Sequence, residues 1–200
     1  MLTLYGISAS RAFRCLWMLE ELGLDFEHVQ TNFTGDQKQP DYLALNPNGH
    51  IPTLVDGDSV LWESLAINLY LAEKHDGGLQ PKTVEGRGQA MQWSLWVMTE
   101  IEKSLLEFLF HSVILPEEQR QPAVRENAVK ALEAPLRVLD AALKNREHLG
   151  GDAFSVTDLN VASVLSWTIL SKYDLSSFPE VDRWLAACIN RPAAQAAMKR

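Results

Sequence analysis

The chain has 200 residues, of which 46% are hydrophobic, and its formal net charge is −8. This much apolar material can form the core of one domain or of two small ones. The acidic balance, without any basic cluster, argues against nucleic acid or an anionic membrane as a partner.

Two further features of the composition narrow the class of protein. No segment reaches about 18 consecutive apolar residues, and the N-terminus lacks a charged region followed by a long apolar run. We therefore expect a soluble, cytoplasmic protein. The only cysteines, Cys15 and Cys188, are far apart and accompany neither a Cys-x-x-Cys pair nor clustered histidines. Neither a disulfide scaffold nor a metal site is expected, and both thiols should be buried and structural.

The first 45 residues alternate between strand and helix signals. A short alternating run over residues 2–5 predicts a strand that ends at Gly6, and a polar turn precedes helical spacing. That helix is expected to run from Arg11 to Gly23, which provides a C-terminal stop. A second strand, a polar loop and a short helical turn are then expected over residues 26–29, 31–39 and 40–45.

Residues 46–67 carry the most information in the chain, and they read NPNGHIPTLVDGDSVLWESLAI. The opening Asn-Pro-Asn-Gly favours a turn. Two β-prone runs, over residues 53–55 and 60–62, flank an Asp-Gly pair that is a strong hairpin signal. From Glu63 the apolar spacing becomes helical to about residue 75, with Ser64 placed to cap the first turn.

The same segment has features that suit a small peptide ligand. The bond between Ile51 and Pro52 can be cis at modest cost, and a cis turn would leave the Ile51 amide and carbonyl free for an extended ligand. A helix that starts at Ser64 presents unpaired amides that suit a carboxylate, and Glu63 beside it would suit an ammonium group. A hairpin and a capped helix without any ligand would explain the same residues.

The ordered motif Asn-Pro-x-Gly-x-Ile-Pro-Thr-Leu, hairpin, Glu-Ser and helix resembles the glutathione-binding half of the glutathione S-transferase superfamily. In that family the residue before a cis-proline pairs with the cysteinyl backbone of glutathione, and the Glu-Ser pair holds the γ-glutamyl end. By this resemblance those roles fall to Ile51, Pro52, Glu63 and Ser64. Lys38 and His50 match positions that contact the glycyl carboxylate and the glutathione backbone in related enzymes, although a lysine in a polar loop can also be simply solvated.

The resemblance also implies the fold and its division into domains. The order β-α-β-α-β-β-α with a proline turn at the third strand is typical of an α/β thioredoxin-like N-terminal domain, expected over residues 1–77. A glycine-rich stretch over residues 77–88 reads as a linker. Residues 86–200 have almost no strand signal, so an all-α helical C-terminal domain is expected there, on the hydrophobic substrate side.

Three features organise the expected helical domain. Residues 87–114 form a long helix that is apolar on more than one face, so it should be covered by more than its own domain. The next helix, over residues 122–145, contains Pro135 and should bend or break there. The sequence Ser-Val-Thr-Asp over residues 155–158 is typical of a capping box that starts an apolar helix, and a final pair of short helices follows.

The implied reaction is attack by the glutathione thiolate on an electrophile, with glutathione as the co-substrate and no metal. A free thiol with a pKa of about 8.5 is only a few per cent ionised at neutral pH. Lowering that pKa by about two units is worth roughly 2.7 kcal/mol, which a hydroxyl donor and helix-terminal amides could supply. A serine after the first strand would donate a hydrogen bond to the sulfur and would need no general base.

The first helix resembles that of serine-type members from bacteria, fungi and plants, but the turn before it is one residue short. Counted forward from residues 4–6, the catalytic serine falls on Ser10. Counted back from Gly23, it falls on Ala9, which has no hydroxyl. Ser8 and Ser10 are therefore both candidates, and Ser10 could also be only the cap of the helix.

The second half of the chain supplies the candidate walls of the electrophile site, although such a stripe is also typical of a core or an interface: Trp93, Trp96, Phe108 and His111. The resemblance favours a homodimeric, cytoplasmic glutathione S-transferase that acts on small hydrophobic electrophiles, as in detoxification. A glutathione-dependent peroxidase or disulfide reductase stays open, since a bound thiolate also attacks peroxides and disulfides. An isomerase or dehalogenase of the same superfamily stays open too, as does a non-enzymatic member that binds ligands or partners.

Overall fold

The computed structural model describes residues 1–75 and 77–200, which form two compact units. Unit 1 contains Met1–Gln80 and Asn190–Arg200, and unit 2 contains Pro81–Ile189. The sequence placed residues 190–200 with the helical domain, whereas the structure packs them with the strands and helices of unit 1.

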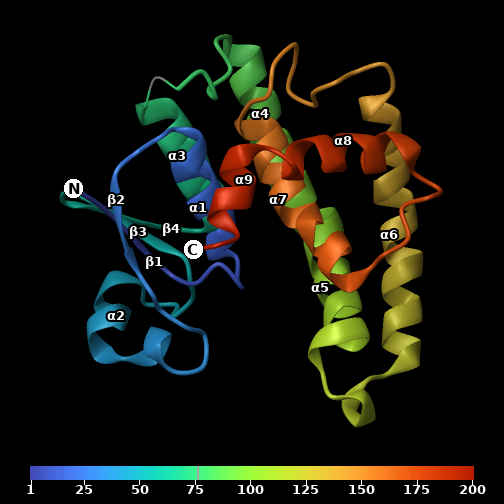
Figure 1. The fold of residues 1–200 in the computed structure, drawn as a ribbon, viewed down its shortest axis with the longest axis horizontal. Coiled ribbons are helices and arrows are strands. Elements are labelled where there is room, and N and C mark those ends of the chain that lie inside the picture. Colours follow the sequence, from blue (N-terminus) through green and yellow to red (C-terminus); the bar gives the residue numbers. More distant parts are fainter. Residues whose placement is uncertain (76) are drawn as a thin grey trace. The chain divides into compact units, whose positions relative to one another are not determined.

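Unit 1 is built on a four-stranded mixed sheet in the order β2-β1-β3-β4 (Figure 1). Its strands are β1 (Leu2–Tyr5), β2 (Phe26–Val29), β3 (Thr53–Asp56) and β4 (Ser59–Trp62). β1 runs parallel to β2 and antiparallel to β3, with Tyr5 opposite Thr53. β3 and β4 form the predicted hairpin, and Gly57 in its turn has φ 59°, a conformation that glycine adopts without steric cost.

Three helices accompany the sheet in the predicted order: α1 (Ala12–Glu21), α2 (Pro40–Leu45) and α3 (Ser64–Lys74), with a short 3₁₀ turn at Asp36–Lys38 before α2. α1 and α3 lie side by side (Figure 1). Residues 12–19 of α1 are all buried, as expected for a helix that is covered on every face. Tyr5 of β1 meets Tyr42 of α2 edge to face, with ring centroids 5.9 Å apart. This arrangement confirms the predicted thioredoxin-like order.

A fourth helix of unit 1, α9 (Pro192–Ala197), comes from the last part of the sequence and packs on α1. Its small residues Ala194 and Ala197 are fully buried. Arg191, just before the helix, donates two hydrogen bonds to the Glu21 carboxylate, at 2.6 and 2.8 Å. Small buried side chains allow close helix packing, and a two-pronged ion pair fixes its register, so residues 190–200 belong with unit 1.

All regular structure in the described part of unit 2 is helical. Its α-helices are α4 (Val84–Trp96), α5 (Lys103–Leu109), α6 (Pro122–Leu143), α7 (Val156–Ser171) and α8 (Pro179–Ile189). The helix expected over residues 87–114 is present, but two π-helical segments, Val97–Glu102 and Phe110–Ile114, interrupt its α-helical hydrogen bonding. A 3₁₀ turn at Glu117–Gln119 then leads to α6.

Pro135 does not break α6, which continues as one helix from Pro122 to Leu143. A proline inside a helix removes one backbone donor and crowds the preceding turn. Pro135 is buried, as are Leu132, Leu136 and Leu139 on the same helix, which packs against α5 and α8. Tertiary packing therefore outweighs the local cost of the proline.

α7 is the central helix of unit 2, where it packs against α4, α5 and α8. The predicted capping box is confirmed, because Ser155 and Asp158 exchange side-chain and backbone hydrogen bonds at its start. The buried Asp158 carboxylate also accepts from the Leu149 amide at 2.6 Å and from the Trp184 indole at 3.0 Å. One carboxylate thus joins a loop, α7 and α8.

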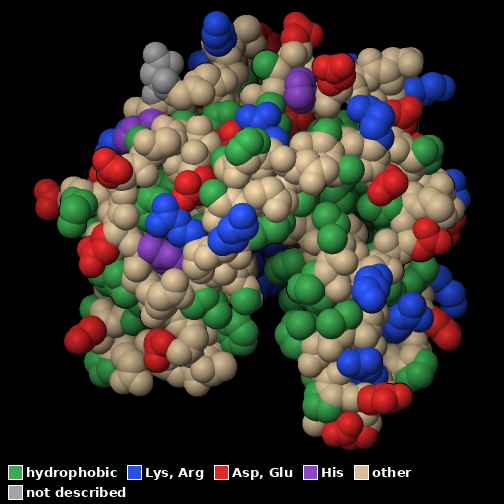
Figure 2. All heavy atoms as spheres, viewed as in Figure 1, with side chains coloured by type: hydrophobic (Ala, Val, Ile, Leu, Met, Phe, Trp, Pro, Cys, Tyr) green, Lys and Arg blue, Asp and Glu red, His purple; other side chains and the backbone are tan. Residues whose placement is uncertain are grey.

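Acidic and basic side chains are interleaved on the face shown in Figure 2. None of the helices that the structure describes is long and apolar enough to cross a membrane. Residues 1–75 and 77–200 contain no group of three or more His, Cys, Asp or Glu side chains that could hold a metal ion.

Candidate functional site

The turn that leads into β3 contains the predicted cis peptide bond, between Ile51 and Pro52. The pairing of β1 with β3 ends at Tyr5 and Thr53, so Ile51 lies outside the ladder of the sheet. Both side chains of the turn are buried, which fixes the turn against unit 1. Backbone groups that lie outside a ladder can pair with an extended ligand.

Two side chains from the segment before the turn hold its backbone. Tyr42 Oη donates to the His50 carbonyl at 2.6 Å, and Asn46 Nδ2 donates to the same oxygen at 2.9 Å. Both side chains also contact the Thr53 hydroxyl, at 2.8 and 3.2 Å. Burial raises the pKa of Tyr42 above its ordinary value, so its hydroxyl stays protonated and keeps this role as a donor. The sequence did not identify this pair as part of the site.

Lys38 and His50, the two candidates for contacts with the glycyl carboxylate and the backbone of glutathione, lie beside the same turn. Lys38 Nζ donates to the Asn48 carbonyl at 3.2 Å. At Gly49, where φ is 58°, an added Cβ would lie 2.7 Å from that ammonium group and 2.9 Å from the Gln37 carbonyl. Only glycine therefore fits under the lysine, and the exposed side chains of Lys38 and His50 flank it.

The cis turn also meets the start of α1 through a close approach at Gly6. A Cβ at Gly6 would lie 2.5 Å from Ala12 Cβ, 3.6 Å from Ile51 Cβ and 3.8 Å from Pro52 Cα. Gly6 also has φ 143°, which side chains rarely adopt. Glycine here lets the end of β1, the first turn of α1 and the cis turn come together.

The Glu-Ser pair joins β4 to α3, but it does so differently from the expectation. Glu63 is the residue before the helix and has φ 72° and ψ 106°, an uncommon conformation for a residue with a side chain. Its carboxylate is exposed, whereas Ser64 is 4% exposed. The expectation that Ser64 caps the first turn is wrong, because Ser64 is already the first helical residue and no side chain caps α3.

The hydroxyl of Ser64 instead accepts a hydrogen bond from Arg14 of α1. The Arg14 side chain is 1% exposed, and its Nη1 lies 3.3 Å from Ser64 Oγ. The Arg14 carbonyl accepts from Asn68 Nδ2 of α3 at 3.1 Å. The sequence did not select Arg14, because its only signal was an arginine near a helix start, and the contact spans 50 positions.

Cys15, next to Arg14, is buried as predicted, and its thiol donates to the Ser64 carbonyl at 3.4 Å. Burial raises the pKa of this thiol far above its ordinary value, and the nearby Arg14 charge opposes that shift only in part. Cys15 therefore remains a protonated structural thiol. Cys188 in unit 2 is also buried, in agreement with the prediction.

Ser8 and Ser10 both lie in the turn between β1 and α1, and both hydroxyls have partners on the main chain. Ser10 Oγ donates to the Ile7 carbonyl at 2.6 Å and accepts from the Ala12 amide at 3.1 Å. Ser8 Oγ donates to the carbonyl of Arg200 at 3.2 Å. Ser10 therefore binds the first turn of α1 much as a cap does, although Arg11 is the residue that precedes the helix.

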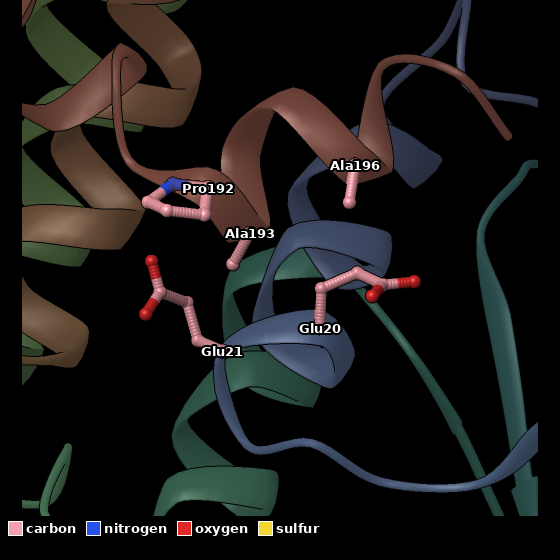
Figure 3. Close-up of a pocket in the computed structure, with 5 residues that line it drawn as sticks. All are labelled: Glu20, Glu21, Pro192, Ala193 and Ala196. Carbon is pink, nitrogen blue, oxygen red and sulfur yellow. The ribbon is translucent and has the colours of Figure 1, made fainter.

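One hollow against α1 lies away from these residues. It has a volume of about 400 Å³ and is lined by Glu20 and Glu21 of α1 and by Pro192, Ala193 and Ala196 of α9 (Figure 3). Glu20 accepts from Arg200 at 2.7 Å, and Glu21 is paired with Arg191. Both carboxylates are occupied and lie at the opposite end of α1 from Ser8 and Ser10, so this hollow is not the candidate site.

The four aromatic candidates in unit 2 fall into two groups. Trp93 and Trp96 are half-buried and pack edge to face, with centroids 4.9 Å apart. Phe108 is 3% exposed and packs edge to face on Tyr173, with the Arg125 guanidinium 5.0 Å from its ring centroid. His111 Nδ1 accepts from the Gln121 amide at 3.0 Å. Phe108 is thus buried inside unit 2, whereas Trp93, Trp96 and His111 are all partly exposed.

Unit 1 therefore gathers three kinds of group around the start of α1. The cis turn offers backbone, the start of α3 offers helix-terminal amides with a buried cation behind them, and the turn before α1 offers two hydroxyls. Such a set can bind an extended peptide with an anionic end and can stabilise an anion near the hydroxyls. Both hydroxyls donate to main-chain carbonyls, so they already act as hydrogen-bond donors.

Two protein-family models match the chain. Residues 1–73 match the model described as Glutathione S-transferase, N-terminal domain, and residues 101–192 match Glutathione S-transferase, C-terminal domain. Among curated proteins, Glutathione S-transferase 3 of Zea mays is 37% identical over 207 residues, which cover 97% of this chain and 91% of that protein. Glutathione S-transferase D6 of Drosophila melanogaster is 32% identical and covers 90% of this chain and 84% of that protein.

Solved structures give the same result for the fold. The theta class glutathione S-transferase from Xanthomonas axonopodis pv. citri, solved with glutathione bound, has a TM-score of 0.92 and 30% identity, covering 100% of this chain and 97% of that one. A glutathione transferase from Burkholderia graminis, with two glutathione molecules bound per subunit, has a TM-score of 0.90 and 31% identity, covering 99% and 87%.

Proposed function

Because the chain belongs to the glutathione S-transferase family, we propose that it binds glutathione in unit 1 and conjugates it to small hydrophobic electrophiles. The observation that carries this proposal is the meeting of the cis turn, the Glu-Ser pair and the serine turn at the start of α1. The close approach at Gly6 brings the cis turn to the start of α1, where the serine turn ends. Arg14 and Cys15 join α1 to the Glu-Ser pair.

Each part of glutathione has a counterpart in this site. The Ile51 backbone before Pro52 pairs with the cysteinyl residue, and Lys38 and His50 receive the glycyl end. Ser64 and the first amides of α3 receive the α-carboxylate of the γ-glutamyl end, and Glu63 receives its ammonium group. These assignments follow the resemblance to the family, and the chemistry of the groups supports them, since each anionic or cationic end of the peptide meets donors or a charge of opposite sign.

The chemical step forms a carbon–sulfur bond. The thiol proton leaves to solvent and the thiolate attacks the electrophile. In a substitution the electron pair of the broken bond departs with the leaving group; in an addition to an activated double bond the π pair shifts onto the electron-withdrawing group, and the adduct takes up a proton from solvent. Ser10 or Ser8 stabilises the thiolate by donating a hydrogen bond, which lowers the pKa of the bound thiol. Trp93, Trp96 and His111, with the buried Phe108 supporting unit 2 from inside, are proposed to form the electrophile-binding surface.

We propose that the protein acts in the cytoplasm as a homodimer. Three side chains on one face of α4 remain exposed, at 70%, 53% and 69%: Val84, Met91 and Leu95. Their spacing of seven and four residues places them in one stripe. A second copy of the chain would cover such a stripe in a two-fold contact.

Thermal unfolding with and without glutathione tests the binding site. A ligand at about 100 times its dissociation constant stabilises the fold by about 2.7 kcal/mol, so the melting temperature should rise by several degrees. Glu63→Gln should remove most of that rise without changing the melting temperature of the free protein, because the side chain is exposed. Glu147→Gln, an exposed glutamate of unit 2, is the matched control and should keep the full rise. No rise with the unmodified protein would contradict glutathione binding.

A second candidate function is glutathione-dependent reduction of disulfides. The Burkholderia graminis relative was solved with two glutathione molecules per subunit, an occupancy that suits thiol–disulfide exchange between two glutathionyl groups. Parallel assays with a chloronitrobenzene, a hydroperoxide and a mixed disulfide separate the two. We expect the chloronitrobenzene to be the best substrate, and turnover of only the mixed disulfide would favour the second function.

A further inference from the structure

We propose that Arg14 is a positioning residue for bound glutathione, which acts by turning the Ser64 hydroxyl toward the α-carboxylate of the γ-glutamyl end. This inference rests on the proposed binding of glutathione in unit 1. It adds to the site a residue that touches Ser64 and not the reacting sulfur.

The Arg14 side chain is held rigidly behind Ser64. It is one of the largest fully buried side chains in the molecule, at 1% exposed, and its Nη1 donates to Ser64 Oγ at 3.3 Å. The backbone of the same residue is fixed to α3, because its carbonyl accepts from the buried Asn68 at 3.1 Å. Both the side chain and the backbone of Arg14 are therefore tied to α3.

The donor and acceptor properties of the two groups decide where the serine proton points. A guanidinium group has donors only, whereas a serine hydroxyl has one proton and two lone pairs. The hydrogen bond from Arg14 therefore uses a lone pair of Ser64 and leaves the hydroxyl proton to be donated elsewhere. A carboxylate at the start of α3 is the acceptor that the helix-terminal amides also favour.

The buried position of Arg14 strengthens the preference of this site for a carboxylate. Inside a protein the effective dielectric constant is lower than in water, so a fixed cation acts on nearby anions over several ångströms. A guanidinium group remains protonated at every pH that the protein survives. The polarised Ser64 hydroxyl and the fixed positive charge together favour a ligand with a free α-carboxylate over one without it.

A chemical double-mutant cycle tests this inference, with binding measured by calorimetry. The two ligands are glutathione and γ-aminobutyryl-cysteinyl-glycine, which lacks only the α-carboxylate. Arg14→Met, which keeps an apolar stem and removes the donors, should weaken glutathione binding about tenfold, as expected for a hydrogen bond to a charged group. The same variant should change binding of the analogue less than twofold.

Two further variants complete the cycle. Ser64→Ala should also weaken glutathione about tenfold and spare the analogue, because it removes the donating hydroxyl itself. Arg14→Lys keeps the charge and the long stem but not the planar fork, so it should weaken glutathione only several-fold and again spare the analogue. Arg14→Lys carries the test alone if Arg14→Met does not fold.

The outcomes separate this inference from the proposed function. If the Arg14 variants weaken both ligands by the same factor, Arg14 only maintains the packing of α1 on α3, and the inference is overturned. If the unmodified protein binds neither ligand, the proposed glutathione site itself fails. Loss confined to glutathione supports both.

Discussion

Ser10→Ala is the substitution that most directly tests how the bound thiol is activated. The Ser10 hydroxyl makes two hydrogen bonds in the turn before α1: it donates to the Ile7 carbonyl at 2.6 Å and accepts from the Ala12 amide at 3.1 Å. To serve a thiolate, the proton must turn from the Ile7 carbonyl to the sulfur. The substitution therefore removes a structural role and, in the liganded protein, a chemical one.

The two roles have different magnitudes. Each neutral hydrogen bond contributes about 0.5–1.5 kcal/mol to stability, so the loss of both should cost about 1–3 kcal/mol. For a chain of this length the melting temperature should fall by roughly 2–12 °C. A bond to a thiolate is worth about 1.5–3 kcal/mol, but the bond to Ile7 must be given up, so the net gain is about 1–2 kcal/mol. Turnover should then slow roughly 5- to 30-fold, and the pKa of bound glutathione should rise by about one unit.

The ultraviolet absorbance of the bound thiolate, followed against pH, separates the chemical role from the structural one. Ser8→Ala is the matched control, since Ser8 lies in the same turn and donates to the Arg200 carbonyl at 3.2 Å. We expect the titration to shift in Ser10→Ala and to stay in place in Ser8→Ala. If Ser10→Ala melts earlier but its titration is unchanged, Ser10 only stabilises the turn. A shift in Ser8→Ala alone would identify Ser8 as the donor.

Three further predictions concern stability and assembly. The hydrogen bond from Lys74, reinforced by Tyr70, lowers the pKa of Asp56, so its contribution to stability is complete above the carboxyl's ordinary pKa and is lost as pH falls. In urea titrations the stability difference between the protein and Asp56→Asn should be constant above about pH 6 and narrow below about pH 4. Asp158→Ala leaves the amides of Leu149 and Ser155 and the Trp184 indole without their acceptor, and should cost at least about 3 kcal/mol in the same assay; a loss under about 1 kcal/mol would contradict this. Sedimentation should give about 45 kDa, twice the chain mass of 22.4 kDa, and Leu95→Glu should shift it toward the monomer, whereas a monomeric parent protein would refute the dimer.

The parts of the fold that the sequence predicted are those encoded by neighbouring residues. The cis bond before Pro52, the hairpin around Gly57 and the capping box at Ser155 each depend on a few consecutive side chains. Turn chemistry and helix capping act over three or four residues, so their signal survives in a single sequence. The order of strands and helices in unit 1 follows from the same local signals.

The parts that the sequence did not predict depend on contacts between distant positions. Ser64 meets Arg14 across 50 positions, and α9 reaches α1 through the pair of Arg191 and Glu21, which are 170 positions apart. An arginine near a helix start or a short alanine-rich helix looks the same whether it faces solvent or a neighbour. Pro135 is the opposite case: the local signal predicted a break, but the packing of α6 against its neighbours keeps the helix continuous.

The environment of Cys15 explains why the site would use the thiol of its ligand and not a cysteine thiol of the chain. Cys15 is the only cysteine of unit 1 and lies against Ser64, within the candidate site. Burial raises the pKa of its thiol so far that the Arg14 charge beside it does not produce a thiolate. The Arg14 guanidinium donates a hydrogen bond to the Ser64 hydroxyl at the start of α3. On the buried Cys15 thiol, by contrast, its charge only partly offsets the effect of burial. Under the proposed function the reacting thiolate therefore belongs to bound glutathione, and the turn of Ser8 and Ser10 offers donors to stabilise it.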